Sequence, residues 1–90
     1  MARKPRPFDG AGELLLAIRP DERVELGQLM ERLGWNRQTL YNRLKVLEEL
    51  GLIDSSYESR PPGRRIIWLT EKGVRVRELL EQLYRLLEER

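Results

Sequence analysis

The chain has 90 residues, 40% of them hydrophobic and 36% charged, with a formal net charge of +2, which is typical of one folded, highly charged domain. It contains no cysteine and no histidine, which excludes disulfides and thiolate chemistry and removes the usual zinc ligands and the usual general base. We therefore expect no enzymatic activity, no cofactor and no metal.

The N-terminal part predicts an arm and a short helix. Residues 1–8 contain two prolines and the basic Arg3, Lys4 and Arg6 without periodicity, which predicts a flexible basic arm. Asp9 is the expected N-cap of a buried helix over residues 13–18, which stops at Arg19-Pro20. The side chains expected to face the core are Leu14, Leu15 and Ile18. Residues 20–23 predict a turn, and Val24 either staples the next helix or adds a short strand residue.

Two further helices follow with a short link. Residues 25–33 place apolar side chains at i, i+3, i+4 and i+7, the spacing of one helix face. Gly34 is the expected C-terminal glycine of this helix. Asn36 is the expected cap of a third helix that ends at Gly51. Its apolar positions are Leu40, Leu44, Leu47 and Leu50, of which the first three must face the core. The three-residue link at 34–36 predicts the sharp crossing of a helix-turn-helix unit, with Trp35 in the core or as a staple.

The pattern then changes to that of strands. Residues 52–59 and 64–69 are rich in β-prone side chains, and Arg60-Pro61-Pro62-Gly63 between them predicts a turn, so we expect an antiparallel hairpin. Alternation places Ile67 and Leu69 on one face of the second strand and Ile66 and Trp68 on the other. Because both faces are apolar, we expect the last helix or a partner chain to cover one of them.

Thr70 is the expected cap of a last helix over residues 71–89. This helix carries about two heptads of apolar seam, which predicts a dimer interface. The seam comprises Val76, Leu79, Leu80, Leu83, Leu86 and Leu87. The alternative is that this helix packs only on the first helix of its own chain.

The near-neutral net charge hides three basic patches. Residues 3–6, 36–45 and 59–65 contain basic but no acidic side chains. Clustered basic residues are the expected footprint of a protein that binds nucleic acid, whereas a single arginine on a helix is ordinarily solvated.

The order of three helices, a basic hairpin and a long helix is that of a winged helix. Residues 36–53 resemble the recognition-helix signature of winged-helix regulators of the MarR, PadR and ArsR types. The pattern Leu-Lys-x-Leu-Glu-x-x-Gly-Leu-Ile is matched by Leu44, Lys45, Leu47, Glu48, Gly51, Leu52 and Ile53. The pattern Leu-Thr-x-x-Gly after the hairpin is matched by Leu69, Thr70 and Gly73.

The resemblance implies an α+β, mostly α winged helix: a three-helix helix-turn-helix unit and a β-hairpin wing, followed by a C-terminal dimerisation helix. The expected divisions are a basic arm (1–8), a DNA-binding domain (9–70) and the dimerisation helix (71–90). The implied function is sequence-specific binding of double-stranded DNA by a homodimeric transcriptional regulator, acting as a repressor. No signal peptide and no apolar run of roughly 18–20 residues is visible, so we expect a cytoplasmic, nucleoid-associated protein without membrane contact.

In winged-helix families the third helix enters the major groove, where arginine pairs with guanine and glutamine or asparagine pairs with adenine. We expect Tyr41 to contact DNA or to lie half-buried against the second helix. Thr39 is expected to bond a phosphate or its own backbone, and Arg43 a phosphate or an acid of the second helix. The full set of predicted DNA-binding residues is Arg37, Gln38, Thr39, Tyr41, Asn42, Arg43 and Lys45 on helix 36–50, and Arg60, Arg64 and Arg65 on wing 58–65.

Two alternatives stay open. A winged helix that serves as a protein–protein interaction module in a transcription complex would present a more apolar, less basic outer face. A sequence-independent chromatin protein would bind DNA without a preferred site. The sequence names no operator, target gene or small-molecule effector.

Overall fold

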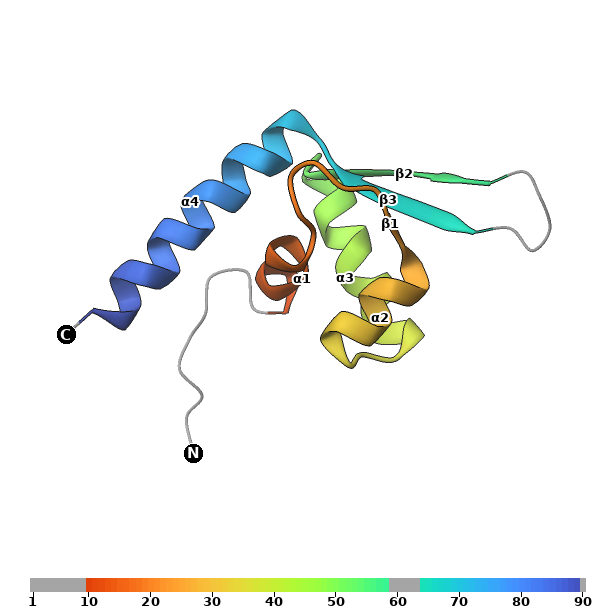
Figure 1. The fold of residues 1–90 in the computed structure, drawn as a ribbon, viewed down its shortest axis with the longest axis horizontal. Helices are drawn as coiled ribbons and strands as arrows, with labels where there is room; N and C mark the ends of the chain where they lie inside the picture. The colour runs from red at the N-terminus through yellow and green to blue at the C-terminus, as the bar shows by residue number, and fades with distance from the viewer. Residues whose placement is uncertain (1–9, 59–63, 90) are drawn as a thin grey trace.

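The computed structural model describes residues 10–58 and 64–89, and within them it has four helices and a three-stranded antiparallel sheet (Figure 1). The elements are α1 (Ala11–Ala17), β1 (Val24–Glu25), α2 (Leu26–Leu33), α3 (Arg37–Glu49), β2 (Ile53–Tyr57), β3 (Arg65–Leu69) and α4 (Glu71–Glu88). The expected α+β, mostly helical winged-helix fold is confirmed. The predicted arm at 1–8, the predicted cap Asp9 and the turn at 60–63 lie outside the described residues.

The core lies between α1, α2, α3 and one face of the sheet, and it is built mainly from leucines. In α3 the side chains of Leu40, Leu44 and Leu47 are completely buried, as their spacing predicts. Leu14 and Leu15 in α1 and Ile18 directly after it are also buried, as expected. The remaining buried apolar side chains are Ala11, Val24, Leu26, Leu29, Leu52, Ile53, Ile67, Leu69 and Leu80.

The helix ends follow local rules at most positions. The Asn36 side chain accepts a 2.8 Å hydrogen bond from the backbone N–H of Thr39, as expected of the cap of α3. Gly34 and Gly51 adopt φ values of 67° and 74°, the left-handed conformation that ends a helix and favours glycine. The cap position of α1 differs from the expectation, because it is occupied by Gly10, which has no side chain to accept a cap hydrogen bond, and not by Asp9.

The sheet has the order β1-β3-β2, so β3 is central. Val24 pairs with Ile67, which settles the open choice for Val24 in favour of a strand. Ile67 and Leu69 face the helices and are buried. Trp68 lies half-buried on the opposite face, where the guanidinium carbon of Arg23 is 4.5 Å from the centre of its ring.

The last helix packs against α1 and then continues away from the rest of the domain. It lies on the side opposite the hairpin of β2 and β3, which is the predicted wing and is called the β2–β3 arm, or the arm, from here on (Figure 1). Leu80 is only 3% exposed in a single chain, and Val76 is half-buried against the core. The structure therefore corrects the predicted seam, because Leu80 and much of Val76 are covered by the chain itself. The exposed part comprises Leu79, Leu83, Leu86 and Leu87.

None of the helices within residues 10–58 and 64–89 is long and apolar enough to cross a membrane.

Candidate nucleic-acid interface

The solvent face of α3 carries polar and basic side chains that the buried leucines direct outward. Arg37, Gln38, Asn42 and Lys45 are all exposed. The Gln38 Nε2 donates to the Asn42 Oδ1 at 3.2 Å, so these two amides share one surface a helical turn apart. Arg37 and Lys45 form no ion pair with any residue that the structure describes. Four of the predicted helix contacts thus lie together on one accessible face.

Tyr41, Thr39 and Arg43 are less accessible than these four. Tyr41 is half-buried and packs on the core, which matches the alternative reading of that residue. Arg43 is half-buried, and its guanidinium carbon lies 4.6 Å from the centre of the Trp35 ring, which itself packs on the core. The expected acidic partner from α2 is not what holds Arg43, because a cation–π contact occupies it. Thr39 is half-buried.

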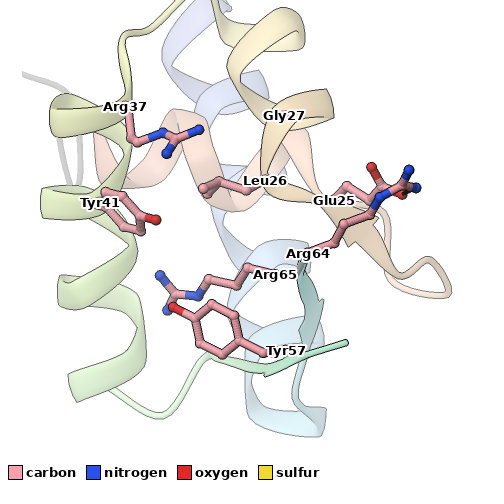
Figure 2. A pocket seen from close by; sticks show the side chains of 8 residues that line it. All are labelled: Glu25, Leu26, Gly27, Arg37, Tyr41, Tyr57, Arg64 and Arg65. Carbon is pink, nitrogen blue, oxygen red and sulfur yellow. Dashed lines mark hydrogen bonds and ion pairs between the residues drawn. The ribbon is translucent and has the colours of Figure 1, made fainter. Parts of the chain in front are cut away.

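The two described arginines of the arm point in different directions, as strand alternation requires (Figure 2). Arg64 turns away from α3, and its Nη1 lies 2.9 Å from the Glu25 Oε1. Arg65 turns toward α3, where its Nη2 donates to the Glu48 carboxylate. The third predicted wing residue, Arg60, lies outside the described residues.

A cleft of about 210 Å³ lies between the first turn of α2, the outer face of α3 and the arm. Figure 2 shows its lining, which consists of Glu25, Leu26, Gly27, Arg37, Tyr41, Tyr57, Arg64 and Arg65. Three arginines and one carboxylate line the cleft, where Arg64 pairs with Glu25. Arg65 pairs with Glu48 outside the lining, so Arg37 carries the positive charge there that no described carboxylate pairs with. Sequence reasoning did not include Tyr57 or Glu25 in the site.

The ion pair between Glu22 and Arg32 stands apart from this surface, because neither residue lines the cleft. The hydrogen bond from Arg32 lowers the pKa of the Glu22 carboxyl to about 2, helped by the backbone N–H of Arg19. Arg32 also donates to the carbonyl oxygen of Ala17 at the end of α1. This pair joins the turn before β1 to α2 and is structural. Within the described ranges no group of three acidic side chains is placed to hold a metal ion.

Comparison with known proteins gives a family and a fold. Residues 12–56 match the family described as "Helix-turn-helix domain". Among curated proteins no sequence match is found.

Several solved structures share the fold. The SlyA-like transcription regulator from Listeria monocytogenes is 24% identical with a TM-score of 0.72, over 82% of this chain and 49% of that one. The AF1382 protein of Archaeoglobus fulgidus is 20% identical with a TM-score of 0.76, over 89% of each chain. The transcriptional regulator YodB of B. subtilis is 21% identical with a TM-score of 0.72, over 84% of this chain and 74% of that one.

This chain spans about half the length of the Listeria regulator. At these identities the likeness concerns the fold, which is the winged helix expected from the sequence. Since the family match covers half of the 90 residues and agrees with the observed fold, the chain belongs to the helix-turn-helix domain family.

Proposed function

We propose that this protein is a transcriptional regulator that binds double-stranded DNA sequence-specifically, with α3 in the major groove and the β2–β3 arm over the adjacent backbone or minor groove. The observation that carries the proposal is the outer face of α3, where Arg37, Gln38, Asn42 and Lys45 lie exposed beside a cleft lined by three arginines. The solved structures of similar fold include proteins named as transcription regulators, which supports the same role.

The chemistry of this face suits base reading. Arginine bonds guanine through two donors, and a glutamine or asparagine amide bonds adenine through one donor and one acceptor. The Gln38–Asn42 hydrogen bond restrains both amides before binding, so less side-chain entropy is lost on contact with the bases. In this proposal, Lys45 and Arg64 extend the positive surface and neutralise phosphates.

We propose that the protein works as a homodimer in which the exposed leucines of two α4 helices cover each other. Leu79 and Leu86 are 64% and 62% exposed in one chain, one heptad apart on the same side of the helix. Such a pair of winged helices would read two half-sites about 34 Å apart, one turn of DNA. A dimer of this size acts most simply by occupying a promoter on chromosomal DNA, as a cytoplasmic, nucleoid-associated repressor.

The test is a mobility shift of the full chain against a pool of random duplexes at two salt concentrations, followed by sequencing of the bound fraction. We expect an enriched, two-fold symmetric motif and a steep loss of affinity with salt. Binding without an enriched motif would favour sequence-independent packing of chromatin. No binding to any duplex at low salt would overturn DNA binding and favour a protein–protein interaction module.

A further inference from the structure

The guanidinium of Arg65 is held between the arm and α3. The Arg65 side chain is only 12% exposed, although its residue belongs to an arm that extends away from the helices. Its Nη2 donates to the carboxylate of Glu48, and its Nε lies 3.4 Å from the Oγ of Ser55. Its guanidinium carbon is 5.6 Å from the ring centre of Tyr41 and 5.9 Å from that of Tyr57. Arg65 of β3 and Glu48 of α3, which are 17 positions apart in sequence, therefore bring the two elements together at one side chain.

This contact lies beyond the part of the arm that the core supports. On the face of the sheet that looks toward the helices, Leu69 and Ile67 are buried in the core. The next residue outward on that face is Arg65, which pairs with Tyr57 across the ladder. Tyr57 is itself largely exposed. Among the described residues, the side-chain contacts of Arg65 with Glu48 and Tyr41 therefore join this outer section of the arm to α3.

Arg64 provides a natural comparison, since it neighbours Arg65 and carries the same charge. It points to the other face of the sheet and pairs with the exposed carboxylate of Glu25. More than half of its side chain is accessible, whereas Arg65 is enclosed by a carboxylate, a hydroxyl and two aromatic rings. Arg64 can exchange its partner for a phosphate at little cost, because an exposed ion pair contributes little stability. Arg65 would have to give up several contacts at once.

We propose that Arg65 is a positioning residue, which sets the angle between the arm and α3 through Glu48 and Tyr41 and does not itself bind a DNA phosphate. The proposal rests on the proposed function and revises the sequence-based expectation for this arginine. With the arm held in place, α3 and the arm meet DNA as one rigid surface, so the cost of ordering the arm is avoided on binding. Glu48 then supports DNA binding despite its negative charge.

The sharpest test uses Arg65→Gln and Glu48→Gln, with Arg64→Gln as the matched control. Affinity is measured for the selected site and for a random duplex over a range of salt. Loss of a phosphate contact weakens both duplexes equally and reduces the salt slope by about 1. Loss of a positioning contact weakens the selected site most and leaves the slope unchanged.

We expect the positioning result, about tenfold weaker binding to the selected site, for both Arg65→Gln and Glu48→Gln, and the phosphate result for Arg64→Gln. Glu48→Gln is the decisive variant, because it removes a negative charge beside the DNA-facing surface. If electrostatics alone mattered, this variant would bind every duplex more tightly, and that result would overturn the proposal. A salt slope reduced by Arg65→Gln would overturn it as well.

A measurement without DNA separates this proposal from the proposed function. Residual dipolar couplings of backbone N–H groups report the orientation of the arm relative to α3 in the free protein. We expect Arg65→Gln and Glu48→Gln to change the couplings of β2 and β3 while those of α3 stay constant, and Arg64→Gln to change neither. Unchanged arm couplings in the first two variants would overturn the positioning role, even if the wild-type protein binds no duplex and the proposed function fails.

Discussion

The Nε of Arg77 in α4 donates a 2.9 Å hydrogen bond to the carbonyl oxygen of Ile18, just past the end of α1. Its Nη2 donates a second bond of 2.9 Å to the carbonyl oxygen of Leu16, and its Nη1 donates to the Glu81 carboxylate. The last carbonyls of a helix have no partner within the helix, and α1 has no basic residue in its last turn. Arg77 supplies these bonds from α4 and so fixes the long helix to the domain.

Replacing this arginine should be costly for stability. We expect Arg77→Met, which keeps much of the aliphatic stem, to lower the free energy of unfolding by about 2–3 kcal/mol, because part-buried carbonyls and a carboxylate lose their donor. Urea denaturation followed by circular dichroism measures this. The control is Arg75→Met, which removes an exposed pair with Glu71 and should cost less than about 0.5 kcal/mol. Equal losses in the two variants would show that the contact with α1 does not anchor α4.

The pair between Glu22 and Arg32 predicts a pH-dependent contribution to stability. The pKa of Glu22 is lowered from 4.5 to about 2, so its contribution is complete above about pH 5 and is lost as the pH falls toward 2. Arg32 is 36% exposed, so solvent screens the pair, and we expect on the order of 1–2 kcal/mol. Glu22→Gln should therefore lower the melting temperature at pH 7 and have little effect near pH 2.

The control for this prediction is Glu31→Gln, which changes an exposed acid of α2 that forms no ion pair with a described residue. It should change stability by less than about 0.5 kcal/mol at either pH. A difference between wild type and Glu22→Gln that persists unchanged at pH 2 would contradict the assignment to ionised Glu22.

Two glycines in helices should respond in opposite directions to alanine. A Cβ at Gly73, in the first turn of α4, would overlap the carbonyl oxygen of Leu52, whose backbone cannot move away without disturbing the start of β2. We expect Gly73→Ala to cost about 2 kcal/mol or more. A Cβ at Gly27 would meet nothing within 4 Å, so Gly27→Ala should stabilise the protein by about 0.5–1 kcal/mol. Thermal unfolding of both variants checks the pair, and a stable Gly73→Ala protein would refute the close approach.

Much of the helical architecture could be predicted because it depends on neighbours in sequence. Leu40, Leu44 and Leu47 face the core wherever α3 packs, and the Asn36 cap and the glycine at position 51 set its limits locally. The same reasoning assigned too much of α4 to a dimer seam. Whether Leu80 is covered by its own chain depends on where α1 lies, and the pattern within α4 carries no information on that.

In the candidate site, too, the side-chain directions set by neighbours in sequence could be predicted, and those set by contacts with another element could not. That Arg37, Gln38 and their neighbours lie outside follows from the buried face of their own helix. The inward direction of Arg65 depends on a carboxylate in another element, and charge alone suggested a phosphate contact. The sequence did contain one indication of this direction. Arg65 is two positions before the core residue Ile67, so both side chains lie on the same face of the strand.

The exposed leucines of α4 predict a dimer that can be disrupted by mutation without unfolding the single chain. We expect Leu79→Gln combined with Leu86→Gln to give a monomer in sedimentation equilibrium, because the two side chains are buried only if a second copy covers them. Each monomer should keep its circular dichroism spectrum, since neither leucine belongs to the core. Affinity for a two-half-site duplex should fall by about 10²-fold or more, as the second contact no longer benefits from the first. A wild-type chain that already sediments as a monomer would refute the interface.

The amides of Gln38 and Asn42 should determine sequence preference, and the cations beside them should determine general affinity. We expect Gln38→Ala to remove about 1–3 kcal/mol of discrimination at one base pair of the half-site, because a bidentate amide contact is lost there. Asn42→Ala should relax the base preference at a neighbouring position of the half-site, since the two side chains lie within hydrogen-bonding distance.

Lys45→Ala serves as the control: it should weaken binding to all duplexes alike and lower the salt slope by about 1. Sequencing of the fraction bound by each variant measures preference position by position. Identical motifs for wild type and Gln38→Ala would mean that this face of α3 does not read bases.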